Sequence, residues 1–300
     1  MKKTKLILGI FLFPFSLMAE GPILIFNSPN VQELPGEFRS TSLIPNGKIP
    51  DKISTEGLDT LNISGSAQYS EEQFSTIKRT IPNLDFVFDL RQESHGFLNG
   101  IAISWLAPKN WINLGLTESQ VIQEEESLLN SLKNMKTVEV YRLAKEADKV
   151  NATVKLWDTI RPKNVLNEAE IIKQKKLTYY RIYVADDRPP LDSEVDRFVP
   201  FWENVPRNKA VHFHCENGHG RTTTFMVMAD ILESAKIVSL SDIFARQAAM
   251  GGVDLTKLPP LDNYAHPYSQ ERLEFLKKFY EYAKSTTKPR PLWSEWKKTN

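Results

Sequence analysis

The only cysteine of the 300-residue sequence, Cys215, lies six positions before Arg221 in the segment HCENGHGRT. Gly218 and Gly220 between them let the backbone turn through conformations closed to residues with a Cβ, so successive amide N–H groups can point into one concavity. Such a loop binds a tetrahedral oxyanion, and its positive field favours thiolate over thiol. The chemistry that these residues could perform is nucleophilic attack on phosphorus, while Arg221 holds two phosphoryl oxygens.

Two neighbours of this loop have roles that residue type leaves open. Thr222 could donate its hydroxyl to the sulfur and ease its departure, or it could cap a helix. His214 could orient the loop from behind, or it could be a hydrogen-bonded core histidine. A single cysteine cannot form a disulfide within its own chain, so a buried packing thiol and an intermolecular bridge are the structural alternatives for Cys215.

The elements around the loop support the chemical interpretation. The segment 209–214, KAVHFH, is typical of a short strand that ends at the cysteine, and 221–232, RTTTFMVMADIL, carries apolar residues at helical spacing. The sequence therefore predicts a strand, a tight glycine loop and a helix, the context in which a bare Cys-x5-Arg spacing becomes specific.

A phosphatase of this kind needs a proton donor, because an alkoxide is a poor leaving group unless it is protonated. A hydrophobic strand predicted at 179–184 is followed by Asp186, Asp187 and a rigid Pro189-Pro190 turn. A carboxylate at a strand end, on a loop that can close over the phosphate, suits this role. Two acidic residues that cap a surface turn are the alternative.

Strand-like and helix-like segments alternate along the chain, which favours an α/β fold. The strand-like segments are 84–90, 137–143, 152–159, 179–185 and 209–214. The helix-like segments are 70–81, 118–135, 164–176, 221–232 and 269–285. The Pro- and Lys-rich tail from Thr286 onward is expected to be loosely ordered.

The N-terminus is typical of a secretory signal peptide, predicted at residues 1–19. Lys2, Lys3 and Lys5 precede an apolar run at 6–18 that is too short to cross a bilayer comfortably, although an uncleaved signal could still act as a membrane anchor. Without residues 1–19, which hold three of the 38 basic and none of the 37 acidic residues, the net charge is −2. We expect an exported protein, periplasmic or secreted, with no bulk attraction to nucleic acid and no stable membrane insertion after cleavage.

The loop HCENGHGRTT resembles that of the protein-tyrosine-phosphatase-like inositol polyphosphate phosphatases, also called cysteine phytases. Further segments resemble blocks of that family in the family's order: 57–74, 89–105, 186–198 and 246–255. The resemblance implies a tyrosine-phosphatase-like core, a central sheet flanked by helices, with a small partial β-barrel domain. We expect residues 20–300 to form the catalytic domain, and broken periodicity suggests a β-rich insertion at about 105–160.

The resemblance also implies residue roles. The family's acid segment, D-H-x-x-P followed by D-R-F, places the acid at Asp186 and Asp187 where a histidine is usual, so which carboxylate donates the proton stays open. His219 departs from the small or apolar residue usual there and could touch a substrate phosphate or face water. The expected catalytic residues are Cys215, Arg221, Asp186, Thr222 and His214, and the expected substrate contacts are Glu216, Asn217, Gly218, His219, Gly220, Asp187 and Arg188. Arg91 and Lys209 could also reach a substrate or could be solvated surface charges, and Gln247 could align a water or belong to a helix-to-turn junction.

The implied activity is hydrolysis of phosphomonoesters of myo-inositol polyphosphates, such as phytate, through a phosphocysteine, with no metal or other cofactor. Three alternatives stay open: a protein-tyrosine, dual-specificity or phosphoinositide phosphatase of the same mechanism, a rhodanese-type sulfurtransferase, and a non-catalytic phosphoinositide-binding module. The order of phosphate removal and the oligomeric state are not determined by the sequence.

Overall fold

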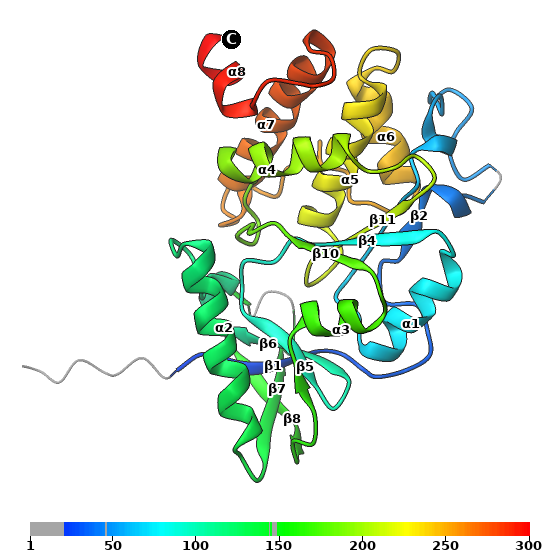
Figure 1. The fold of residues 1–300 in the computed structure, drawn as a ribbon. Helices are drawn as coiled ribbons and strands as arrows, with labels where there is room; N and C mark the ends of the chain where they lie inside the picture. Colours follow the sequence, from blue (N-terminus) through cyan, green and yellow to red (C-terminus); the bar gives the residue numbers. More distant parts are fainter. Residues whose placement is uncertain (1–20, 46, 144, 146–148) are drawn as a thin grey trace, which may run out of the picture.

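The structure, a computed structural model, describes residues 21–45, 47–143, 145 and 149–300, so the predicted signal peptide lies outside the described residues. Two sheets organise the chain (Figure 1). The five-stranded sheet has the order β10 (Thr178–Arg181), β4 (Leu84–Asp89), β11 (Ala210–His214), β3 (Ile63–Ser66), β2 (Arg39–Ser40). The six-stranded sheet has the order β8 (Val154–Ile160), β7 (Val138–Leu143), β1 (Ile23–Ser28), β6 (Ile101–Leu106), β5 (His95–Leu98), β9 (Val165–Leu166).

Four strands of the five-stranded sheet, β10, β4, β11 and β3, run parallel. The register pairs His214 with Ser66 on one side and with Asp89 on the other, and Arg181 also pairs with Asp89. The carboxyl ends of all four strands therefore meet at one edge, which is where open α/β sheets bind their ligands. Every residue of β11 is buried, as expected for a parallel strand covered on both faces.

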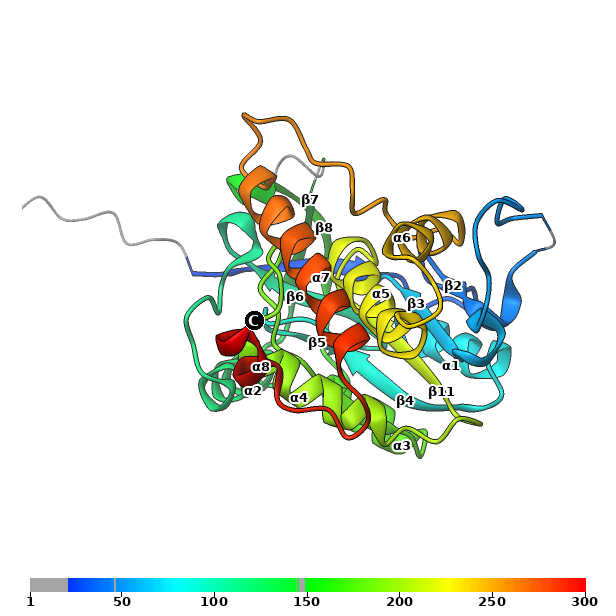
Figure 2. The same ribbon diagram turned by 90° about the horizontal axis from the view of Figure 1, so that it is seen from above.

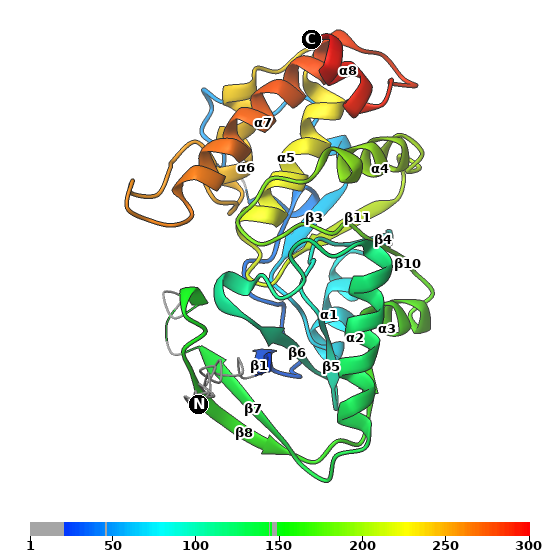
Figure 3. The same ribbon diagram turned by 90° about the vertical axis from the view of Figure 1, so that its left-hand side faces the viewer.

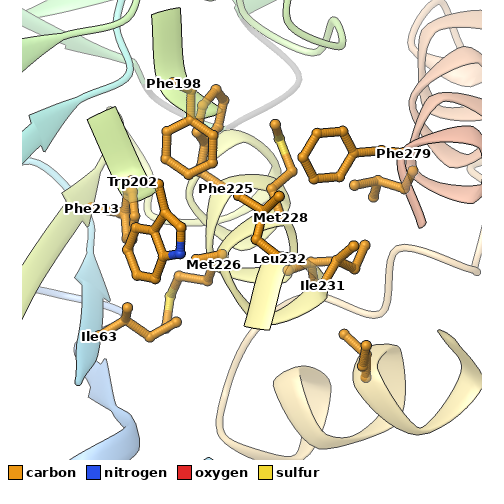
Figure 4. Packing of buried hydrophobic residues seen from close by; sticks show 14 of the residues in the cluster. Ile63, Phe198, Trp202, Phe213, Phe225, Met226, Met228, Ile231, Leu232 and Phe279 are labelled. Carbon is orange, nitrogen blue, oxygen red and sulfur yellow. The ribbon is translucent and has the colours of Figure 1, made fainter. Parts of the chain in front are cut away.

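Helices cover both faces of this sheet (Figures 1 and 2). On one face lie α4 (Asp192–Glu203), α5 (Gly220–Ser234), α6 (Leu240–Ala249), α7 (His266–Ser285) and α8 (Trp293–Thr299). On the other face lie α1 (Glu71–Thr80) and α3 (Glu168–Gln174). Helix α5 is buried along almost its whole length, which is why it has apolar residues on every side. Figure 4 shows Met226 and Phe225 of α5 among Phe198, Trp202 and Phe213 in the main core.

The six-stranded sheet forms a second unit with its own core, to which α2 (Glu118–Lys133) contributes Leu129 and Leu132 (Figure 3). Three short 3-10 helices complete the described elements: η1 (Thr41–Leu43), η2 (Leu58–Thr60) and η3 (Pro108–Asn110). The sheet is open, with β8 and β9 at its edges. Its strands include β1 and β5 before residue 105 and β9 after residue 160, so the sheet extends beyond the predicted insertion on both sides. The limits of the insertion as a separate domain stay a prediction.

Three local expectations need correction. The predicted helix at 164–176 is shortened to α3, because β9 occupies its first residues and pairs with β5. The predicted strand 179–184 ends at Arg181. The prediction of a loosely ordered tail is wrong, because Trp293 is 1% exposed and packs against Phe279 and Tyr282, which anchors α8. Among the described helices, none has the length and apolar character needed to cross a membrane.

Candidate active site

The Cys-x5-Arg loop lies at the carboxyl edge of the parallel sheet, between β11 and α5. Gly218 has φ +71°, and a Cβ at that position would lie 2.6 Å from the main-chain carbon of Ser66, so the loop passes too close to β3 for any larger residue. The guanidinium of Arg39 donates to the Gly218 carbonyl oxygen (3.0 Å) and to Thr223 Oγ1 (3.0 Å). The buried guanidinium of Arg39 therefore fixes the main chain of the loop at Gly218.

Cys215 lies at the base of this loop and is 3% exposed. The hydroxyl of Thr222 donates a hydrogen bond to its sulfur, with Oγ1 3.2 Å from Sγ. Helix α5 has His219 as its N-cap and receives no side-chain cap hydrogen bond, so Thr222 does not act as the helix cap. Of the two roles open from sequence, the geometry of Thr222 supports the one directed at the sulfur.

Arg221 is held in one orientation by Glu93, which follows β4. Its Nη1 and Nη2 donate to the two carboxylate oxygens of Glu93 at 2.6 and 2.9 Å, and Nη1 also donates to the Val184 carbonyl at 3.1 Å. Burial alone would raise the pKa of Glu93, but Arg221 and Arg91 outweigh burial and lower it to about 2. A buried two-point ion pair of this kind preorganises the guanidinium for an anion.

Arg91 binds the Glu93 carboxylate, and its guanidinium does not reach the surface. Its side chain is fully buried, its Nε donates to Glu93 Oε1 (2.8 Å), and its Nη1 donates to Gln68 Oε1 (2.8 Å) and Asn27 Oδ1 (3.2 Å). The residue is at the site, as expected, but as a buried partner of the carboxylate that orients Arg221.

Asp186 brings a second carboxylate to Arg221. Its Oδ1 lies 3.1 Å from Arg221 Nη2, and its Oδ2 accepts hydrogen bonds from Lys149 Nζ and from Asn110 Nδ2 (3.3 Å). Burial favours the neutral acid, but the Arg221 and Lys149 cations outweigh burial and hold the pKa of Asp186 below its ordinary value. The Asp186 carboxylate thus pairs with both cations.

The next two residues point elsewhere. Asp187 has φ +64°, and its Oδ2 accepts a hydrogen bond from Tyr264 OH at 2.6 Å. Arg188 places its guanidinium carbon 4.7 Å from the ring centroids of both Trp111 and Tyr268. Both were expected as substrate contacts, and both have side chains engaged with neighbouring aromatic residues.

His214 lies behind the loop, fully buried, and its Nε2 is 2.6 Å from Glu168 Oε1. Glu168 comes from α3 and also accepts a hydrogen bond from Tyr69 OH at 2.6 Å. Burial raises the pKa of Glu168, but His214 and its other partners outweigh burial and hold it well below its ordinary value. Both roles open from sequence, loop support and core histidine, fit this position.

Near Glu168 lies a buried group, Asp89, His95 and Glu168, whose polar atoms lie within 4.8 Å of one another. His95 Nδ1 contacts the Glu93 carbonyl (2.9 Å), and its Nε2 contacts Asp89 and Glu168 at 3.2 and 3.3 Å. Burial lowers the pKa of His95, but the Asp89 carboxylate outweighs it and raises that pKa to about 9. The two carboxylates already contact other basic groups, Asp89 with Arg181 at 3.0 Å and Glu168 with His214 at 2.6 Å, so the group fits an ion-pair cluster better than a metal site.

The remaining loop residues lie as follows. Glu216 is 8% exposed, and its carboxylate accepts hydrogen bonds from Asn110 (2.8 Å) and Asn27 (3.3 Å), so it links the loop to η3 and to β1. Asn217 is half-buried. His219 is exposed on the rim, with Nε2 3.5 Å from Glu37 Oε1. Any substrate contact of Glu216 would therefore come through its main chain.

Two residues considered from sequence lie away from the site. Lys209 precedes β11, at the opposite end of that strand from Cys215, and pairs with Asp85 at 3.6 Å. Gln247 donates to Asp230 Oδ2 (2.9 Å), and Asp230 lies roughly 13 Å along α5 from Arg221. Neither expectation, of substrate contact by Lys209 or of water alignment by Gln247, fits these positions.

Sequence reasoning missed several residues at the site, namely Arg39, Glu93, Asn110, Trp111, Lys149, Glu168 and Arg272. A polar residue just after a predicted parallel strand was the available signal for Glu93, because such residues meet at the carboxyl edge. Lys149 and Asn110 belong to segments without a recognisable pattern. Arg272, on α7, is 9% exposed, and its Nη1 lies 2.8 Å from where a Cβ on Gly220 would be.

A parallel α/β sheet with a Cys-x5-Arg loop at its carboxyl edge defines the tyrosine-phosphatase class of folds, which confirms the predicted fold class. The sequence model of the PTP-like phytase family, whose description reads "Inositol hexakisphosphate", matches residues 88–233. A PTP-like phytase structure from Bdellovibrio bacteriovorus is 30% identical, with a TM-score of 0.72, over 95% of this chain and 99% of its own. The chain belongs to the PTP-like phytase family.

Two other similar proteins are longer. The PTP-like myo-inositol phosphatase from Mitsuokella multacida, solved with myo-inositol-(1,3,4,5)-tetrakisphosphate, is 36% identical with a TM-score of 0.86, over 95% of this chain and 49% of that one. Effector protein hopD2 of Pseudomonas syringae pv. tomato is 29% identical over 267 residues, 87% of this chain and 56% of its own length. The chain therefore spans about half the length of these two relatives.

Proposed function

We propose that the protein hydrolyses phosphomonoesters of myo-inositol polyphosphates through a phosphocysteine on Cys215. The observation that carries this proposal is the convergence of three groups at one strand edge: the Cys215 sulfur under its Thr222 hydrogen bond, the Arg221 guanidinium fixed by Glu93, and the Asp186 carboxylate 3.1 Å from that guanidinium. These are a nucleophile, a two-point anion ligand and an acid.

In the first step, the Cys215 thiolate attacks phosphorus in line with the leaving oxygen. A sulfur–phosphorus bond forms, and the ester oxygen–phosphorus bond breaks with both electrons going to the ester oxygen. Arg221 and the loop amides hold the three equatorial oxygens, where charge accumulates. Because Glu93 already orients the guanidinium, little reorganisation is needed as the phosphoryl group moves.

The departing ester oxygen takes a proton from Asp186. In the free protein the Arg221 and Lys149 cations favour the carboxylate form of Asp186. A bound phosphate competes for these same cations, which weakens their hold on Asp186 and lets burial favour the protonated acid. Substrate binding thus favours the protonated form of Asp186, which is the form that can donate a proton.

In the second step, Asp186, now a carboxylate, takes a proton from a water that attacks phosphorus. The sulfur–phosphorus bond breaks, and the thiolate and inorganic phosphate are released. The Thr222 hydroxyl, 3.2 Å from the sulfur, stabilises the charge that returns to it.

An inositol polyphosphate is supported as substrate by the family and by the charges near the loop. Arg272 Nε has no hydrogen-bond partner, and no described carboxylate forms an ion pair with its guanidinium. Burial lowers the pKa of Arg272, which means that its charge is incompletely compensated. A phosphate group of the substrate would supply the missing anion. We also propose export, which rests on the predicted signal peptide at residues 1–19.

Initial rates test this function. The purified protein, with a metal chelator present, is given inositol hexakisphosphate, a phosphotyrosyl peptide and a short-chain phosphoinositide in parallel. We expect the highest kcat/KM on inositol hexakisphosphate. A higher value on the peptide or the lipid would transfer the proposal to that substrate, and binding of these compounds without phosphate release would favour a non-catalytic module.

Substitution of Arg272 by methionine is expected to raise KM for inositol hexakisphosphate by roughly 10-fold or more, because it removes a charge-assisted contact while keeping the apolar stem. The matched control is Lys209→Met, at the far end of β11, which should leave KM unchanged. The measurement is KM and kcat for both variants. An unchanged KM in Arg272→Met would show that Arg272 does not contact the substrate.

A further inference from the structure

We propose that Trp111, with Arg188 stacked on it, is a positioning residue for the acid Asp186. This inference rests on the proposed function and deepens it. The segment that follows β6 of the six-stranded sheet carries Trp111 to the turn at residues 185–188, the acid turn, which holds Asp186. The unit built on the six-stranded sheet would then take a direct part in the chemistry at the carboxyl edge of the five-stranded sheet.

Trp111 contacts the acid turn through its indole nitrogen. Nε1 donates a hydrogen bond to the main-chain oxygen of Asp186 at 3.0 Å. The preceding residue, Asn110, is 2% exposed and donates to the Asp186 carboxylate, with Nδ2 3.3 Å from Oδ2. Two consecutive residues therefore hold both the main chain and the side chain of Asp186.

The backbone of this segment is unusual in a way that fits such a role. Lys109 and Asn110 both have left-handed φ values, 60° and 61°. Residues other than glycine adopt this conformation mainly where the surroundings require it. Here it turns Asn110 toward Asp186 and Glu216, and it directs the Trp111 indole toward the acid turn.

Arg188 closes the arrangement from the other side of the turn. Its guanidinium carbon lies 4.7 Å from the ring centroid of Trp111 and 4.7 Å from that of Tyr268 on α7. The two rings lie edge to face, 5.4 Å apart at 81°. The Arg188 amide donates to the Ala185 carbonyl at 3.2 Å. The Arg188 guanidinium thus contacts an aromatic residue from each unit, and together with the hydrogen bond from Trp111 to Asp186 it forms a clamp on the acid turn.

The consequence for catalysis is specific. A positioned acid matters when the leaving group is a poor one, such as an alkoxide, and matters little when the leaving group is a stable aryloxide. Loss of the clamp should therefore lower the rate on alkyl esters selectively. A residue with only a structural role would lower both rates together.

The test is Trp111→Phe, which keeps an aromatic ring for Arg188 but removes the N–H donor. The substrates are p-nitrophenyl phosphate and an alkyl ester, glycerol 2-phosphate. We expect kcat/KM, which reports on phosphocysteine formation and not on the hydrolysis step that both esters share, to fall by about 10-fold or more on the alkyl ester and to change by less than about threefold on the aryl ester. The matched control is Trp157→Phe, in β8 of the same sheet, where the ring stacks on Phe26; both rates should stay unchanged.

A second variant, Arg188→Met, tests the stacked cation independently of Trp111 and should shift the two rates in the same way. In an Asp186→Asn background, Trp111→Phe should have no further effect, because the acid is already absent. Equal losses on both esters, no loss on either, or a further loss in the Asp186→Asn background would overturn the inference.

The proposed function and this inference can fail separately. A wild-type protein that cleaves both small esters but not inositol hexakisphosphate would disprove the proposed substrate, and the clamp would still be measured on the two esters. A protein that cleaves none of the three would overturn both.

Discussion

Replacement of Cys215 by serine is expected to lower the rate of phosphate release at least ~10⁴-fold, an increase of roughly 5.5 kcal/mol in the activation barrier. A serine hydroxyl is not ionised at neutrality by the loop amides and Arg221, so the nucleophile would be lost while the anion site remained. Rapid acid quench with ³²P-labelled substrate should find label on the wild-type protein and none on the variant.

Binding and stability provide the control for this substitution. Cys215→Ser should keep the melting temperature of the wild type and its affinity for inorganic phosphate, since Arg221 stays fixed by Glu93. Residual activity above about 1% of wild type would contradict the assignment of Cys215 as nucleophile.

Substitution of Asp186 by asparagine is expected to lower kcat on inositol hexakisphosphate by ~10²- to 10⁴-fold, the usual contribution of a positioned general acid. Asparagine keeps the shape of the side chain and its hydrogen bond from Lys149 but has no acidic proton. The decline of kcat at alkaline pH, which reflects the need for a protonated acid, should disappear in this variant. Initial rates across a pH series measure both effects.

The neighbouring carboxylate supplies a matched control. Asp187→Asn removes a negative charge one residue away, but Asp187 accepts from Tyr264 OH and does not face Arg221. We expect its kcat to stay within about tenfold of wild type, with the alkaline decline retained. If the two variants exchanged these properties, Asp187 would be the proton donor.

The parallel arrangement of the main sheet explains why some of the site could be predicted and some could not. Residues at the ends of β3, β4, β10 and β11 meet only because the strand order brings their carboxyl ends to one edge. Sequence reasoning identified the end of β11, which Cys215 follows, and a strand before Asp186, although β10 ends earlier than predicted. It did not identify Glu93 after β4, although the same rule applies there.

Charged residues in the core were the hardest to predict. Arg272 is within a helical pattern, in which a charged residue normally faces solvent, yet it is nine-tenths buried beside the loop. Glu168 is in the first turn of α3, where an acidic residue is expected on electrostatic grounds alone, yet it bonds His214. A local pattern cannot show which partner a buried charge has.

The sequence alone predicted a nucleophile and an anion site, because Cys215, the glycines and Arg221 are contiguous and local backbone geometry fixes their relation. It also determined the strand, loop and helix that carry them. The tertiary structure decided the surroundings: Glu93 on Arg221, Lys149 on Asp186, and Trp111 against the acid turn. It also separated two adjacent aspartates, because the left-handed backbone at Asp187 directs one carboxylate toward Tyr264 and leaves the other beside Arg221. Contacts between residues distant in sequence depend on how the sheets and helices pack, and a linear pattern does not encode that packing.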